Sequence, residues 1–192
     1  TLQRQLGIET VWDRLRSISN PAPITRQVLG VSQADWVEPM AHVLSRLGVQ
    51  KGMVVYGRDG TDELSAAANT RICEFADGQY KTYEICPEQF SLQRCDVREL
   101  QGGTPTENAA MTRRVLRGEI GPCRTAILLN AGAGLYIGGA SLTLAAGITR
   151  ARELIDSGMA LEKMEDFIAM SQNMGKIEKV KIATCQDELN MV

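Results

Sequence analysis

The stretch GMVVYGRDGTDE at residues 52–63 decides the fold. It begins with the pattern of a buried strand and continues as a polar, acidic loop. Residues 52–56 form a short apolar run of the kind that buried strands have. A second such run, QVLGV at residues 27–31, precedes it, and residues 32–47 between the two carry apolar side chains at helical spacing. Strand, helix and strand in this order predict a parallel pair of strands with a right-handed crossover.

The rest of the chain is expected to add a hairpin and several helices to this pair. Residues 70–75 and 80–85 have the pattern of two strands, and the Asp77-Gly78 step between them is typical of a tight hairpin turn. The run TPTE at residues 104–107 has the cap, the early proline and the glutamate of a helix start. Three further helices are expected at residues 125–137, 141–156 and 159–173.

These alternating elements predict an α/β fold with a mostly parallel sheet flanked by helices. The chain has 192 residues, which is enough for one domain with a substantial core and too few for two of ordinary size. We therefore expect one α/β domain over residues 1–175, followed by a charged tail at residues 176–192.

The composition is that of an ordinary globular domain. Hydrophobic residues make up 44% and charged residues 23% of the chain, and the formal net charge is −2. Binding to nucleic acid is therefore not expected, since it normally needs a basic face. The five cysteines have no CxxC spacing, which is typical of reduced thiols in a cytoplasmic protein. We recognise neither a signal peptide nor an apolar run long enough to cross a bilayer, so we expect no membrane partner.

Three carboxylates, Asp59, Asp62 and Glu63, follow the strand at residues 52–56. In open α/β sheets, ligands bind beyond the carboxyl ends of the strands, which is where these side chains should lie. Adjacent carboxylates on a glycine-containing turn suit Mg²⁺, which prefers oxygen ligands and often bridges carboxylates to substrate phosphates. A solvated acidic turn that caps a following helix would have the same sequence, so the residues alone leave both interpretations open.

Four segments carry a resemblance to a known family. They are GVSQADWVEPMAHVLSRLGVQKGMVVYGRDGTDELS (residues 30–65), GGTPTENAAMTRRVLRGEIGP (102–122), ILLNAGAGLYIGG (127–139) and ARELIDSGMALEKME (151–165). In this order and spacing they resemble the anthranilate phosphoribosyltransferase family, over nearly the whole chain up to about residue 172. Several ordered motifs together are a more specific signal than any one of them.

The resemblance implies a carboxyl-terminal domain like that of nucleoside phosphorylases and phosphoribosyltransferases. It implies transfer of a phosphoribosyl group from phosphoribosyl pyrophosphate to the amine of anthranilate, a step of tryptophan biosynthesis. Asp62 and Glu63 match the family's pair that holds Mg²⁺ against the pyrophosphate, so they would act as metal ligands and not in proton transfer. A metal held there would stabilise the charge that accumulates on the leaving pyrophosphate. No residue is assigned as a catalytic acid, base or nucleophile.

The beginning of the chain departs from the family pattern near the substrate. The family's anthranilate-contacting arginine matches Gln3, an asparagine matches Asp13 and a glycine matches Arg16. The carboxylate of Asp13 would repel an anionic aromatic acid, and Arg16 would either offset that repulsion or block the site.

The family's upstream helical region, Gly-Thr-Gly-Gly-Asp phosphate loop and Lys-His-Gly-Asn motif do not occur in these 192 residues. We therefore expect the isolated chain to be inactive. The family forms homodimers largely through the helical region, so we expect this chain alone to be monomeric or to expose an apolar patch.

Two other functions are compatible with the sequence. A non-enzymatic relative that binds nucleic acid or another protein would explain the altered segment at residues 3–17, although Asp62 and Glu63 argue for retained metal chemistry. Binding of single-stranded DNA that weakens steeply with salt would favour this alternative. A pyrimidine nucleoside phosphorylase is a third interpretation, which the loop at residues 59–63 and the final helices fit less well.

Overall fold

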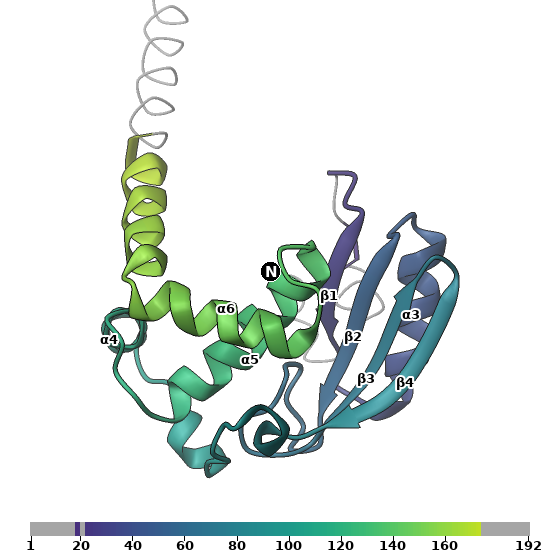
Figure 1. Ribbon diagram of the computed structural model, residues 1–192, viewed down its shortest axis with the longest axis horizontal. Coiled ribbons are helices and arrows are strands. Elements are labelled where there is room, and N and C mark those ends of the chain that lie inside the picture. The colour runs from purple at the N-terminus through teal and green to yellow at the C-terminus, as the bar shows by residue number, and fades with distance from the viewer. Residues whose placement is uncertain (1–17, 20–21, 174–192) are drawn as a thin grey trace, which may run out of the picture. The chain divides into compact units, whose positions relative to one another are not determined.

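The computed structural model describes residues 18–19 and 22–173 (Figure 1). The chain divides into two compact units. The first unit consists of the described residues up to Gly102 together with residues 120–152, and the second of residues 103–119 and 153–173. The predicted boundary at residue 175 and the charged tail beyond it lie outside the described residues.

The first unit is built on a sheet of four strands, β1 (Arg26–Gly30), β2 (Lys51–Gly57), β3 (Thr70–Ala76) and β4 (Gln79–Ile85), in that order. β1 and β2 pair in parallel, as predicted, whereas β2–β3 and β3–β4 are antiparallel. The predicted α/β fold is confirmed, but the sheet in the described residues is mixed and not mostly parallel. The reason lies in the connection from β2 to β3, a loop at residues 58–69 without a crossover helix, which returns the chain antiparallel.

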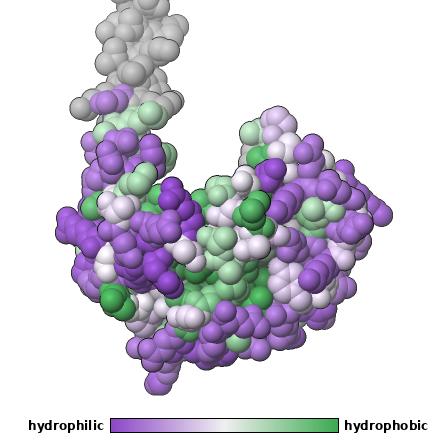
Figure 2. Space-filling model, in the orientation of Figure 1, coloured by the Kyte–Doolittle hydropathy of each residue, from purple (hydrophilic) through white to green (hydrophobic). Residues whose placement is uncertain are grey.

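β3 and β4 form the hairpin that the Asp-Gly step predicts. Asp77 and Gly78 have φ values of 50° and 77°, and positive φ at both central residues is the geometry of a tight hairpin turn that follows the twist of the strands. β4 exposes most of its side chains. Its exposed surface is mainly hydrophilic (Figure 2), which protects this edge of the sheet from pairing with other chains.

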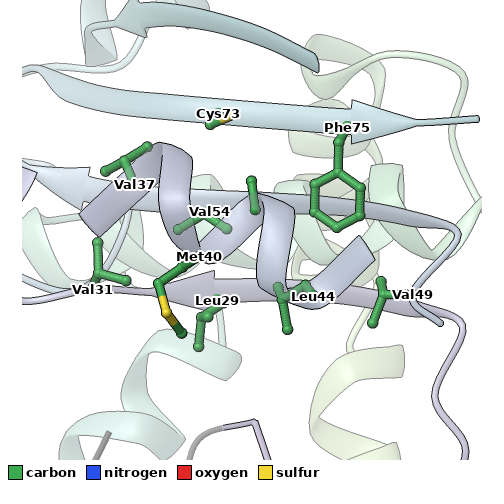
Figure 3. Packing of buried hydrophobic residues seen from close by; sticks show 10 residues of the cluster. Leu29, Val31, Val37, Met40, Leu44, Val49, Val54, Cys73 and Phe75 are labelled. Atoms are coloured by element: carbon green, nitrogen blue, oxygen red, sulfur yellow. The ribbon is translucent and has the colours of Figure 1, made fainter. Parts of the chain in front are cut away.

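Helix α3 (Val37–Arg46) covers one face of the sheet with an apolar stripe (Figure 3). Val37, Ala41 and Leu44 follow one another at helical spacing and are almost fully buried. They pack with residues from the first three strands, Leu29, Val54, Cys73 and Phe75. Burial of a side chain of the size of Leu or Phe stabilises a fold by about 1.5–3 kcal/mol, so this cluster is a main source of stability.

Strand β2 is buried on both faces. Val54 packs in the α3 cluster, and its neighbours Met53 and Val55, which point to the other face, are no more than 1% exposed. Helix α5 (Pro122–Gly138) contacts β1 and β2 and covers that second face (Figure 1). A strand covered on both sides reads as a continuous apolar run, which is why residues 52–56 predict it so clearly.

A carboxylate joins α5 to the hairpin. Glu74 on β3 accepts hydrogen bonds from the hydroxyl groups of Tyr136 on α5 and Tyr83 on β4, the latter at 2.8 Å. Burial and the bond to Glu74 raise the pKa of Tyr136 to about 12, and the same causes raise the pKa of Tyr83. Both phenols therefore stay protonated, as donation to a carboxylate requires.

Helix α6 (Leu144–Asp156) packs closely against α5 in the first unit. A Cβ atom on Gly132 of α5 would lie 2.5 Å from Cγ1 of Ile148, so only glycine fits there. The helix begins later than predicted, because Thr143 accepts a hydrogen bond from the N–H of Ala146 at 3.1 Å. Short 3₁₀ helices complete the unit, at η1 (Ala34–Trp36), η2 (Pro87–Phe90) and η3 (Val97–Leu100).

The second unit contains helix α4 (Pro105–Leu116), the end of α6 and a helix at residues 159–173. The predicted capping box is present, because Thr104 accepts from the N–H of Glu107 and the carboxylate of Glu107 accepts from the N–H of Thr104. Across both units, none of the helices in the described residues is long and apolar enough to span a membrane.

Candidate metal-binding site

The acidic loop lies at the carboxyl end of β2, directly beside the carboxyl end of β1. The two strands are parallel, so their ends meet at the same edge of the sheet. A Cβ atom on Gly30, the last residue of β1, would lie 1.6 Å from the carbonyl oxygen of Asp62. Glycine at the end of β1 therefore lets the backbone of the loop lie against the strand.

Asp59 holds the loop in shape through hydrogen bonds to both of its carboxylate oxygens. Its Oδ1 accepts from the hydroxyl of Thr61 at 2.9 Å, and its Oδ2 accepts from the hydroxyl of Ser65 at 2.7 Å. Burial by itself would raise the pKa of Asp59, but the bonds from Ser65 and Thr61 outweigh it and hold the pKa below its usual value. Asp59 is therefore ionised at neutral pH, with both oxygens engaged inside the loop.

Asp62 and Glu63 expose their side chains to solvent beyond the strand ends. Leu64, the next residue, is fully buried and anchors the loop in the core. Two adjacent carboxylates thus stand on a backbone that is fixed on the Leu64 side. Asp62 and Glu63 differ in their surroundings from Asp59, which is hydrogen-bonded within the loop, a difference that the residue pattern without the family resemblance did not reveal.

Asn130 on α5 reaches this loop and was not predicted as a site residue. Its Oδ1 accepts from the N–H of Leu64 at 2.9 Å, and its Nδ2 donates to the carbonyl of Leu64 at 3.0 Å. Nδ2 also lies 3.5 Å from Oε2 of Glu63. The signal for it was an amide among the apolar residues 126–135, since a polar side chain that is partly covered in such a stretch needs hydrogen-bond partners.

The chemistry of the pair fits Mg²⁺. This ion keeps several waters and is usually held by one or two carboxylates together with substrate phosphates. Nowhere in the described residues do three or more Asp, Glu, His or Cys side chains gather as a closed metal cage. Asp62 and Glu63 instead form an exposed pair of adjacent carboxylates, an arrangement that would leave coordination positions of a bound ion open to phosphate oxygens.

The other predicted site residues, Gln3, Asp13 and Arg16, lie outside the described residues, so their part in substrate binding stays a prediction. His42 of α3 packs against Tyr80 of the hairpin, with tilted rings whose centroids are 4.0 Å apart.

The basic side chains of α4 form ion pairs within the second unit. Arg113 lies 3.4 Å from Glu165, and Arg114 lies 3.2 Å from Glu119. Paired arginines present less positive charge to a polyanion, so this helix does not favour the nucleic-acid-binding alternative.

The structure defines an α/β protein with a parallel strand pair and an acidic loop at its carboxyl edge, the edge at which open α/β sheets commonly bind ligands. The chain belongs to the glycosyl transferase family, a/b domain, whose family model matches residues 1–161. The family resemblance predicted from the four sequence segments is thereby confirmed.

Curated relatives and solved structures agree with this assignment. The chain is 43% identical over 87% of its length to the anthranilate phosphoribosyltransferase of Methanobrevibacter smithii, and it covers 50% of that protein. It matches a crystal structure of the Thermus thermophilus enzyme of the same name with a TM-score of 0.79 and 41% identity, covering 87% of this chain and 49% of that one. The Saccharomyces cerevisiae enzyme in complex with PRPP and Mg matches with a TM-score of 0.78 and 25% identity, over 88% of this chain and 49% of that one. The chain therefore spans about half the length of the curated relatives it matches.

Proposed function

We propose that the whole protein transfers the phosphoribosyl group of phosphoribosyl pyrophosphate to anthranilate, and that this chain contributes the Mg²⁺ ligands. Asp62 and Glu63 are the proposed ligands, and the proposed place of the reaction is the cytoplasm. The observation that carries the proposal is the exposed pair at the shared carboxyl edge of β1 and β2, in a chain of this family.

The proposed mechanism is a displacement at the ribose. The bond between C1 of the ribose and pyrophosphate breaks, a bond from the amine nitrogen of anthranilate to C1 forms, and the amine loses a proton. Bound Mg²⁺ would neutralise charge on the departing pyrophosphate. Asp62 and Glu63 serve only to hold it, and the hydrogen-bonded loop around Asp59 keeps them in place before substrate arrives.

The test is the activity of the whole protein with charge-neutralised ligands. We expect Asp62→Asn and Glu63→Gln each to lower kcat/KM for phosphoribosyl pyrophosphate by about 100-fold or more, the usual effect of removing one electrostatic stabiliser. The assay follows the loss of anthranilate fluorescence at several Mg²⁺ concentrations.

Asp77→Asn is the matched control, because it removes a carboxylate of the same size from the hairpin turn. It should leave the rate unchanged. Full activity of the Asp62→Asn, Glu63→Gln double variant, or a rate that does not depend on divalent metal, would show that the proposed role of the pair is wrong.

A further inference from the structure

We infer that Asn130 is a positioning residue for the acidic pair. Its side-chain amide fixes the backbone immediately after Glu63 and thereby sets where Asp62 and Glu63 present their carboxylates to a metal ion. The inference rests on the proposed function, because it concerns the geometry of the same metal-binding site.

The amide of Asn130 holds both backbone groups of one loop residue. Its oxygen accepts from the N–H of Leu64 at 2.9 Å, and its nitrogen donates to the carbonyl of the same residue at 3.0 Å. Two bonds in opposite directions leave the Leu64 peptide groups little freedom to rotate. Since Leu64 directly follows Glu63, this bonding fixes the direction in which the chain enters the acidic pair.

The two side-chain amide hydrogens of Asn130 have nearer acceptors than the carboxylate of Glu63. Nδ2 carries two hydrogens, and its two nearer acceptors are the carbonyl oxygens of Leu64 and Ala126, both at 3.0 Å. The carboxylate of Glu63, at 3.5 Å, lies at the limit of a hydrogen bond. Asn130 therefore binds the backbone of the loop and leaves the carboxylate for a ligand.

The amide of Asn130 also has a partner within α5, because Nδ2 donates to the carbonyl of Ala126, four residues earlier in the same helix. The bonds to Leu64 instead cross 66 residues of sequence to the residue that follows the acidic pair. Within the pair, the backbone carbonyl of Asp62 lies close against Gly30. The backbone of the pair is thus positioned at Asp62 as well as at Leu64, as for preorganised metal ligands.

The test is metal affinity in the 192-residue chain, measured with Mn²⁺ alone from the electron paramagnetic resonance signal of the free ion. We expect Asn130→Ala to weaken Mn²⁺ binding about 10-fold, because groups that orient metal ligands contribute to affinity on this scale. The Asp62→Asn, Glu63→Gln double variant is measured beside it as the reference for loss of the site.

Asn108→Ala is the matched control. Asn108 also lies on a helix and holds one loop residue from both sides, since it accepts from the N–H of Gly103 at 2.8 Å and donates to its carbonyl at 3.3 Å. The substitution is the same and the contacts are of the same kind, but the held residue does not adjoin the acidic pair. We expect its Mn²⁺ affinity to equal that of the unmodified chain.

A second measurement needs no variant and applies even if Asn130→Ala does not fold. In the metal-free chain, the N–H of Leu64 should exchange slowly with solvent deuterium, because Asn130 holds it before any ligand binds. Fast exchange that slows only when Mn²⁺ is added would overturn the inference.

The outcomes of the titration separate the two proposals. Unchanged affinity in Asn130→Ala, together with a loss in the double variant, would overturn the positioning role and leave the proposed ligands in place. Unchanged affinity in the double variant would remove the metal site itself, and the role of Asn130 with it. Weakening in Asn130→Ala and the double variant, but not in Asn108→Ala, supports both.

Discussion

At the scale of single residues, three carboxylates within five positions have different roles because they have different hydrogen-bond partners. Asp59 is bonded to Thr61 and Ser65, and Ser65 in turn accepts from the N–H groups of residues 67 and 68. Asp62 and Glu63 are exposed. A carboxylate whose oxygens are occupied stabilises the loop, whereas exposed carboxylates can take a metal ion.

Asp59→Ala should therefore lower the free energy of unfolding, and not only weaken metal binding. We expect the free energy of unfolding to fall by about 1–3 kcal/mol. The hydroxyl groups of Thr61 and Ser65 would lose the partly buried, charged carboxylate that accepts their hydrogen bonds. Urea denaturation followed by circular dichroism measures this. Asp62→Ala, an exposed position in the same loop, is the control and should change stability by less than about 0.5 kcal/mol. Equal losses in the two variants would contradict the division of roles.

The lowered pKa of Asp59 adds a pH dependence with a definite sign. The folded state binds the proton less tightly than the unfolded state, so this contribution to stability is present above the ordinary aspartate pKa of about 3.9 and is lost as the pH falls below it. We expect the stability of the unmodified chain to fall in this acidic range, and the stability of Asp59→Ala to fall less steeply. Parallel stability curves from pH 5 to pH 2 would contradict this.

At the scale of elements, α5 joins the site to the core. One side of the helix reaches the acidic loop through Asn130, and Tyr136 reaches the hairpin through Glu74. Its contact with α6 depends on Gly132, where no side chain fits. The position of this helix therefore affects both the packing of the sheet and the geometry of the acidic pair.

Gly132→Ala should destabilise the fold, although alanine is the better helix former. The added Cβ atom would lie 2.5 Å from Ile148, and overpacking of this kind costs about 1–3 kcal/mol. Gly134→Ala, two residues later on the same helix and with nothing within 4 Å, is the control and should stabilise by about 0.5–1 kcal/mol. Opposite shifts in the urea midpoint would confirm the close contact between the helices, and a gain in both variants would contradict it.

At the scale of the whole molecule, the chain covers about half of each curated relative that it matches. Under the proposed function, this chain would contribute the metal ligands. The family resemblance implies that a phosphate loop and a helical region, whose motifs do not occur in these 192 residues, would complete the site.

The purified 192-residue chain should therefore give no turnover of anthranilate with phosphoribosyl pyrophosphate and Mg²⁺, although it should still bind Mn²⁺. Anthranilate fluorescence measures the first property, with the whole protein under the same conditions as the positive control. Measurable product formation by the chain alone would show that the acidic loop and its surroundings are sufficient for the reaction.

Local patterns in the sequence by themselves determined the strands, the α3 stripe, the Asp77-Gly78 turn and the α4 capping box, because each depends on residues close together in the chain. The acidic pair followed from its place after a strand and from the family resemblance. Only the tertiary structure decided that the sheet is mixed, that Asp59 is engaged within the loop and that Asn130 holds Leu64. The direction of a strand relative to its neighbour depends on the path of the loop that connects them. A contact between residues 66 positions apart depends on tertiary packing, which no local pattern contains.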